Sequence, residues 1–108
     1  MTICIPIAEN SKTSPVSLKF ARSNFFAIVD KDGETVKFIE NPYRNLNKEV
    51  GTKLLPWLEE EYKIDTLLGF ELGFKVQQAA NEHKIQLIII SEKKRTLKQL
   101  LNFMNIEF

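Results

Sequence analysis

The sequence predicts a single α/β domain over residues 1–108, with a mixed five-stranded sheet and helices on both faces. Three observations carry this prediction. The length of 108 residues is that of one domain, and no repeat or linker interrupts it. Two apolar runs flank Asp32-Gly33, a dipeptide typical of a hairpin turn. Beyond residue 50, segments with helical periodicity alternate with short apolar runs, which indicates crossover connections between parallel strands.

The first part of the chain predicts three strands and one long loop. Residues 2–7 form an apolar run and predict a buried first strand. Residues 10–24 are polar, and we expect a long loop of the kind that is often functional. Residues 24–29 and 35–39 predict an antiparallel hairpin, because Asp32-Gly33 supplies the positive φ angles of a tight turn.

The first predicted helix has two alternative starting points. A start near Asn47 would place Pro56 where it kinks the helix, whereas Thr52 as N-cap would place Pro56 in the first turn. Either start gives a helix whose apolar residues recur near helical spacing, at Val50, Leu54, Trp57, Leu58 and Tyr62.

The remaining elements continue the alternation. Residues 65–70 predict a fourth strand and residues 73–82 a second helix. Residues 85–90 form an apolar run, from which we expect a central strand covered on both faces. Thr96 and Gln99 have the spacing of a capping box and predict the start of a last helix. The resulting order, β-β-β-α-β-α-β-α, predicts a three-layer, ribonuclease-H-like arrangement.

The residue counts exclude several classes of function. Lys plus Arg number 15 and Asp plus Glu 14, and this net charge of +1 argues against broad nucleic-acid binding. With Cys4 and His83 as its one cysteine and one histidine, a single chain forms no disulfide and no four-ligand site for zinc or an iron–sulfur cluster. We expect a cytoplasmic protein without signal peptide or membrane span, since the thiol is unpaired and no apolar run approaches roughly 20 residues.

Several short segments stand in a characteristic order along nearly the whole chain. These segments are Ile3-Cys4-Ile5-Pro6, Ser17-Leu18-Lys19-Phe20-Ala21-Arg22, Phe25-Phe26-Ala27-Ile28-Val29-Asp30, Phe38-Ile39-Glu40-Asn41-Pro42, Ile64-Asp65 and Gly73. Their order and spacing resemble the dinitrogenase iron–molybdenum cofactor biosynthesis family, which includes NifX-like carriers and the C-terminal domain of NifB-like proteins. The resemblance implies a ribonuclease-H-like fold, a non-enzymatic binding role and an iron–sulfur or iron–molybdenum cofactor as cargo.

The sequence departs from the family pattern at the expected cluster ligand. Family members carry His-Phe-Gly-Arg before the second strand, but here Lys19 stands in place of the histidine and Ala21 in place of the glycine. Lysine is a poor iron ligand because its amine is protonated near neutral pH. We therefore expect direct cluster ligation to be lost. Cys4 and His83 remain as candidate metal ligands, although we expect a buried core residue and a partly exposed helix cap, respectively.

Positive charge offers another kind of site. Lys19, Arg22 and Lys75 follow strands whose ends we expect at one edge of the sheet, where ligands bind in α/β folds. Gly73 begins a helix, whose free N–H groups and positive dipole end favour anions. With Phe20 as a wall, these residues predict a pocket for a phosphate, a carboxylate or an anionic cluster. The alternative is that the three cations are simply solvated.

Three functions follow from these patterns. The first is a non-enzymatic accessory or carrier domain that retains an anion-binding pocket. The second is a regulatory or protein-interaction module of the same fold without metal, which exposes the apolar residues 103–108. The third is a metal-dependent nuclease with Glu9 and Glu71 as metal ligands.

The expected partners follow from the first two functions. We expect a protein partner or an anionic small ligand, no nucleic acid and no membrane, and a monomer or homodimer. We expect Lys93-Lys94-Arg95 to be a solvated turn before the last helix, the alternative being a contact with an acidic partner or nucleic acid.

Overall fold

The structure is a computed structural model that describes residues 1–46, 50–91 and 95–106. Within these ranges the chain forms five strands and three helices. In chain order they are β1 (Thr2–Ile7), β2 (Phe25–Asp30), β3 (Thr35–Glu40), α1 (Val50–Tyr62), β4 (Thr66–Gly69), α2 (Phe74–Glu82), β5 (Gln86–Ile89) and α3 (Leu97–Phe103). None of these helices is long and apolar enough to cross a membrane.

The strands form one mixed sheet in the order β3-β2-β1-β4-β5. β1 pairs antiparallel with β2 and parallel with β4, so that Cys4 lies between Ile28 and Leu67. The hairpin connection makes β2 and β3 antiparallel, whereas crossovers through α1 and α2 place β4 and β5 parallel to β1. The predicted mixed five-stranded sheet is confirmed.

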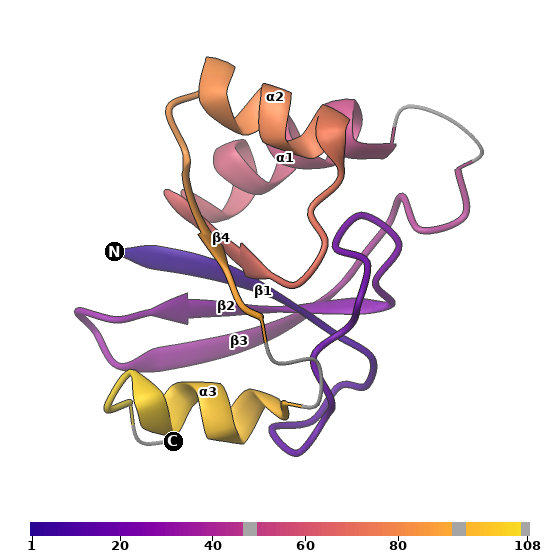
Figure 1. Cartoon of the computed structure of the whole chain (residues 1–108). Helices are drawn as coiled ribbons and strands as arrows, with labels where there is room; N and C mark the ends of the chain where they lie inside the picture. The colour runs from indigo at the N-terminus through magenta and orange to yellow at the C-terminus, as the bar shows by residue number, and fades with distance from the viewer. Residues whose placement is uncertain (47–49, 92–94, 107–108) are drawn as a thin grey trace.

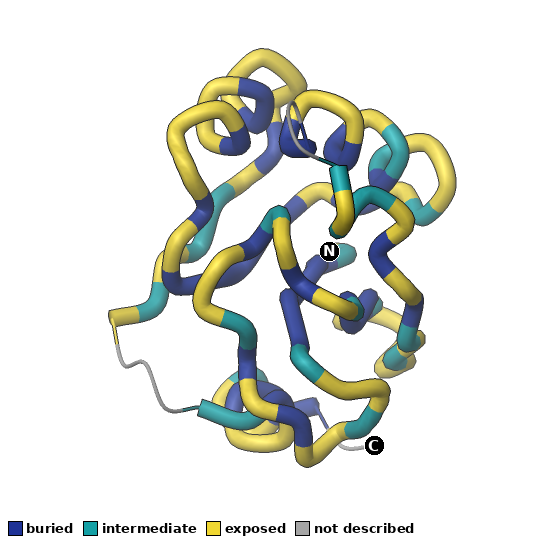
Figure 2. Tube along the Cα trace, turned by 90° about the vertical axis from the view of Figure 1, so that its right-hand side faces the viewer, coloured by how far each residue is buried: buried dark blue, intermediate teal, exposed yellow. Residues whose placement is uncertain are grey.

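The sheet separates two apolar cores, which makes the domain three layers thick (Figure 1). α1 and α2 cover one face, and α3 covers the other. Side chains alternate along β1, so that Cys4 faces the α1–α2 core while Ile3, Ile5 and Ile7 face the α3 core. Figure 2 shows the buried positions gathered between these layers and the exposed ones on the outer sides of the helices. Helices on both faces are thus confirmed.

The long loop after β1 contacts both the start of α3 and the turn after β4. Val16 bridges Ile7, and its N–H donates to the carbonyl of Arg95 just before α3, at 2.8 Å. Further along, Lys19 forms a parallel bridge with Glu71 after β4. The loop therefore connects the start of α3 with the turn that leads into α2.

The position of β5 differs from the prediction. We expected a central strand over residues 85–90, but β5 lies at the edge of the sheet. The side chain of Ile89 is 59% exposed, while Leu87 packs against the α1–α2 core and Ile88 against the α3 core. An apolar run reports that a strand touches two layers, but the order of strands depends on partners elsewhere in the chain.

The hairpin is confirmed, but its turn differs from the prediction. The only glycine with positive φ in the described residues is Gly73, so Gly33 does not supply the left-handed conformation. Glu34 has a φ of 52° instead. The carboxylate of Asp30 accepts hydrogen bonds from the N–H groups of Asp32 and Gly33, at 3.1 and 3.2 Å. This side-chain turn moves the left-handed residue to the end of the loop.

The starts of α1 and α3 can be compared with the prediction. Thr52 lies inside α1, so the alternative with Thr52 as N-cap is wrong, and Pro56 lies within the helix. The other alternative, a start near Asn47, lies outside the described residues. The capping box of α3 is confirmed, because Thr96 accepts from the N–H of Gln99 and the Gln99 side chain accepts from the N–H of Thr96.

Candidate functional site

The loop after β1 and the turn after β4 lie side by side at one edge of the sheet. The N–H of Phe20 donates to the carbonyl of Glu71, and the N–H of Glu71 donates to the carbonyl of Leu18, both at 3.1 Å. These two bonds extend the parallel pairing beyond the strands themselves. The sequence prediction that both segments emerge at the same edge is met by this pairing.

A hollow of about 290 Å³ lies at this junction, which we call the Lys19 pocket. Phe20 forms one wall of the pocket. Its side chain is buried, and the centroid of its ring lies 5.1 Å from that of Phe26. The residues that line the pocket are Lys19, Phe20, Ala21, Arg22, Glu71, Leu72 and Gly73.

Lys75, which the sequence placed with Lys19 and Arg22, lines a separate hollow with Thr52 and Glu82. α2 begins at Phe74, and each residue of a helix turns the side chain by about 100°. This rotation carries Lys75 to the side of α2 that faces α1. The predicted group of three cations is therefore divided between two hollows.

Arg22 is tied to the segment that follows β3. Its guanidinium donates to the carbonyl of Arg44, at 3.3 Å, and to the carbonyl of Leu46. These bonds fix the charge at the mouth of the Lys19 pocket while they use part of its donor capacity. These contacts could not be predicted from the sequence, because carbonyl acceptors carry no side-chain signature.

Asn41 supports the loop that carries Lys19 and Arg22. The Asn41 side chain is almost fully buried, and its amide donates to the carbonyls of Ala21 and Ser23, at 3.0 and 2.9 Å. Its side-chain oxygen accepts from the N–H of Tyr43 at 3.0 Å. Asn41 is therefore a positioning residue, a role that its place in the segment Phe38-Ile39-Glu40-Asn41-Pro42 did not predict.

Gly73 marks the boundary between the Lys19 pocket and α2. Its φ of 78° and ψ of 151° fall in a region that favours glycine. A Cβ at this position would meet no atom within 4 Å, so the space beside it is open. The positive end of the α2 dipole therefore lies beside the pocket.

The pocket also contains a negative charge that the sequence analysis did not place there. Glu71 was considered only as a partner of Glu9 in a nuclease site, but its backbone pairing with Lys19 makes it part of the pocket. Within the described ranges, no three His, Cys, Asp or Glu side chains lie together in a way that could hold a metal ion. Neither Glu9 nor Glu71 therefore belongs to such a group.

The two candidate soft ligands lie away from the Lys19 pocket. Cys4 is fully buried in the middle of β1, and burial raises the pKa of its thiol. His83 is the C-cap of α2, and its Nδ1 lies 2.5 Å from Oε1 of Glu59 on α1. The structure thus places Cys4 in the core and His83 at a helix end.

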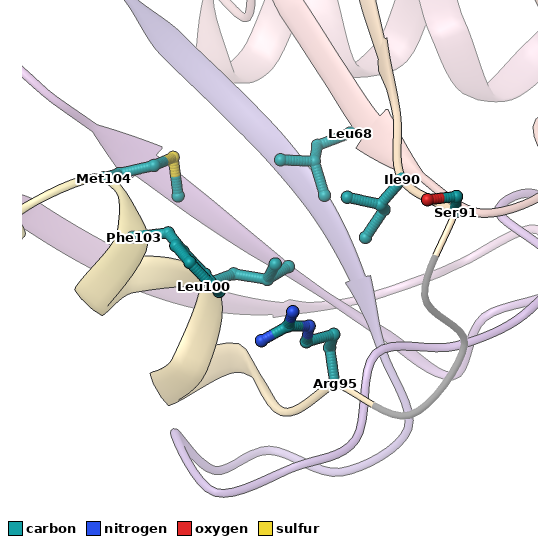
Figure 3. Close-up of a pocket in the computed structure, with 7 residues that line it drawn as sticks. All are labelled: Leu68, Ile90, Ser91, Arg95, Leu100, Phe103 and Met104. Atoms are coloured by element: carbon teal, nitrogen blue, oxygen red, sulfur yellow. The ribbon is translucent and has the colours of Figure 1, made fainter.

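Another hollow lies on the opposite face of the sheet, beside α3 (Figure 3). Part of the apolar segment 103–108 borders it, and the side chain of Phe103 is 68% exposed. Ile106 is buried instead, while residues 107 and 108 lie outside the described residues. Lys93 and Lys94 of the predicted basic turn also lie outside them.

A match to a family model gives the family of the chain, and solved structures share its fold. A family model described as dinitrogenase iron-molybdenum cofactor matches residues 1–105. The apo form of the orange protein from Desulfovibrio gigas is similar in structure, with a TM-score of 0.83 and 21% identity over 96% of this chain and 87% of that one. No curated protein matches the sequence directly.

Two further solved structures share the fold. A NifB-like protein from Thermotoga has a TM-score of 0.79 and 19% identity, over 96% of this chain and 86% of that one. The protein PH0822 has a TM-score of 0.76 and 23% identity, over 97% of this chain and 91% of that one. At these identities the likeness concerns the arrangement of helices and strands.

Proposed function

Because the chain belongs to the dinitrogenase iron-molybdenum cofactor family over residues 1–105, we propose that it is a non-enzymatic accessory domain that holds an anionic ligand in the Lys19 pocket. The observation that carries this proposal is the meeting of Lys19, Arg22 and the Gly73 end of α2 around one hollow. The proposal includes the loss of direct cluster ligation, since Lys19 stands where the family has histidine.

The charges of the pocket suit an anion. Lys19 and Arg22 bring two positive charges, Glu71 brings one negative charge, and the N-terminus of α2 adds a partial positive charge. A lysine amine acts as a compact point charge with three donors, which suits an oxyanion or the sulfide face of an anionic cluster. The cargo would then be held by charge and hydrogen bonds.

The positions of the soft ligands support the same proposal. The thiol of Cys4 is enclosed in the α1–α2 core, and burial keeps its pKa high, so it lacks the thiolate character that metals bind. The imidazole of His83 contacts Glu59 at the far end of α2 from Gly73. Neither group lines the Lys19 pocket.

The non-enzymatic role has a further basis in the hydroxyls near the pocket. Ser17 and Ser23 lie with their Oγ atoms 2.9 Å apart, and the Ser23 hydroxyl also contacts the carbonyl of Ile7 at 2.8 Å. These hydroxyls are engaged in the loop structure, and the contacts that they make are with one another and with carbonyls rather than with a general base.

Equilibrium dialysis with molybdate and with inorganic phosphate tests the pocket. We expect Lys19→Gln to weaken binding by about tenfold, because one charge-assisted contact is lost. Lys75→Gln is the matched control: it removes the same charge from a neighbouring hollow, and binding should stay unchanged. Equal weakening by both variants, or no binding of either probe to the wild type, would contradict the pocket.

Anaerobic reconstitution with iron and sulfide tests the lost ligation separately. After reconstitution we expect protein without stoichiometric iron and without visible absorption from a cluster, and we expect Lys19→His to retain more iron than the wild type. Stoichiometric iron in the wild type would show that ligation persists. Protein that binds neither iron nor either anion would favour the alternative of an interaction module without metal.

A further inference from the structure

The hollow beside α3, which we call the α3 groove, has a volume of about 300 Å³. It is separate from the Lys19 pocket, since it borders the α3 core while Phe20 and Leu72 of the Lys19 pocket belong to the α1–α2 core. The residues that line the α3 groove are Leu68, Ile90, Ser91, Arg95, Leu100, Phe103 and Met104.

The position of β5 at the sheet edge leaves the groove open. Leu68 comes from β4 and Ile90 follows β5, and within the part of the chain that the structure describes no strand pairs with the outer side of β5. On the opposite side, Leu100, Phe103 and Met104 stand at i, i+3 and i+4 along α3 and its C-cap, which places them on one stripe. The result is a trough with apolar walls between the sheet and the helix.

One end of the groove is positively charged. The guanidinium carbon of Arg95 lies 4.6 Å from the centroid of the Phe103 ring, a cation–π contact that holds the side chain against the helix. The carbonyl of Arg95 accepts from the N–H of Val16 at 2.8 Å, which fixes the backbone as well. Figure 3 shows the guanidinium directed into the space between Leu100 and Ile90, with the Ser91 hydroxyl at the border of the same space.

We propose that the α3 groove binds a small carboxylate with an apolar tail. Among the described residues that line the groove, Arg95 is the only charged one, so its positive charge is complementary to an anionic head group and not to a cationic one. The planar fork of a guanidinium matches a carboxylate, and the hydroxyl of Ser91 is a further hydrogen-bond donor among the lining residues. The tail would lie on Leu68, Leu100 and Met104.

The size of the groove restricts the ligand further. A volume of about 300 Å³ is at the lower end of the range for ligand pockets. A short aliphatic or aromatic acid fits this volume, whereas a long-chain lipid does not. Apolar walls with one fixed cation are the pattern of a site that takes most of its binding energy from the tail and its selectivity from the head.

Methionine-methyl NMR with octanoate as the probe tests this proposal. The chain has two methionines, and Met104 lines the groove while Met1 lies at the start of β1. We expect octanoate to shift the Met104 signal to saturation and to leave the Met1 signal in place. Octanol and octylamine, which have the same tail, should bind at least about tenfold more weakly, because they lack the charge-assisted contact.

Two variants give the matched comparison. Arg95→Gln should weaken the binding of octanoate by about tenfold and leave the binding of octanol unchanged. Lys98→Gln removes a positive charge from an exposed position of α3 that does not line the groove, and octanoate binding should not change.

Three results would overturn the proposal. One is a Met104 signal that does not move with octanoate up to about 10 mM. The second is octanol that binds as tightly as octanoate, and this comparison uses the wild type, so it holds even where Arg95→Gln unfolds. The third is equal weakening by both variants, which would indicate general charge attraction instead of contact with Arg95.

Discussion

Nδ1 of His83 lies 2.5 Å from Oε1 of Glu59, so the one histidine of the chain joins the C-cap of α2 to α1. Both side chains are about one-third exposed, at 37% and 32%. The contact joins the C-terminal parts of α1 and α2, which pack on the same face of the sheet. The histidine thus has a structural partner at the C-terminal end of α2, opposite to the end that borders the Lys19 pocket.

Substitution of His83 should cost little stability. We expect His83→Ala to lower the free energy of unfolding by about 0.5–1 kcal/mol, because partly exposed pairs are screened by solvent. Urea denaturation measures this change, and a double-mutant cycle with Glu59→Gln isolates the pair. Glu82→Gln, at an exposed position one residue earlier, is the control and should have no effect. A coupling energy of zero would mean that the contact contributes nothing in solution.

The buried thiol of Cys4 should make the folded protein less stable at alkaline pH. Burial raises the pKa of the thiol above its value in the unfolded chain, so only the unfolded chain releases this proton at moderately alkaline pH. The free energy of unfolding should therefore be constant with respect to this group below about pH 8.5, the pKa of a free thiol, and fall above it.

The thiol is testable in two ways. Native protein should react with a thiol reagent far more slowly than protein in urea, since Cys4 is fully buried. Cys4→Ala should lose about 1–2 kcal/mol of stability through its cavity and should also lose the alkaline slope that this group contributes. Fast labelling of the folded protein would show that β1 opens readily.

Whether Gly51→Ala raises or lowers the free energy of unfolding should depend on the side chain of Val76. Alanine is favoured over glycine within a helix by about 1 kcal/mol, but a Cβ at Gly51 would lie 2.8 Å from Cγ2 of Val76. We expect Gly51→Ala to destabilise the protein by about 1–2 kcal/mol, because α1 would be pushed from α2.

The matched background for this test is Val76→Ala. Removal of the Val76 methyl groups removes the collision, so Gly51→Ala should stabilise that variant by up to about 1 kcal/mol. The same sign of effect in both backgrounds, measured by thermal unfolding, would contradict the close contact.

Asn41 should link stability to the shape of the Lys19 pocket. Asn41→Ala leaves the carbonyls of Ala21 and Ser23 without this partner, so we expect a loss of about 2–3 kcal/mol. Molybdate binding should weaken too, because the displaced loop carries Lys19. Asn24→Ala is the control: the side-chain amide of Asn24 donates an exposed hydrogen bond to the carbonyl of Ala8 at 3.3 Å, and the cost of its loss should stay below about 1 kcal/mol. Unchanged molybdate binding in Asn41→Ala would show that the loop is held by other contacts.

The sequence predicted most of the fold because its signals were local. The apolar run of β1, the hairpin and the capping box of Thr96 and Gln99 each depend on neighbouring residues. The place of β5 in the sheet was wrong because strand order depends on distant partners. The turn at Gly33 was wrong because the side chain of Asp30 competes for the backbone donors of the loop.

The candidate site was predicted in part for the same reason. Lys19 and Gly73 meet because the ends of β1 and β4 share a sheet edge, which topology alone indicates. The separate position of Lys75 follows from the rotation of α2, and the place of Glu71 follows from a backbone bridge. The α3 groove was missed because Leu68, Arg95 and Met104 come from segments that only the folded chain brings together.

The two edges of the sheet differ in how well they resist self-association. On β3, the exposed side chains of Lys37 and Glu40 place charge along the outer strand. On β5, the exposed positions are Gln86 and Ile89, and neither carries a charge. Unpaired backbone groups without nearby charge are templates for aggregation, and the four-residue length of β5 is its main protection. Concentrated solutions should therefore precipitate through this edge first, and Ile89→Lys is the change that should improve storage.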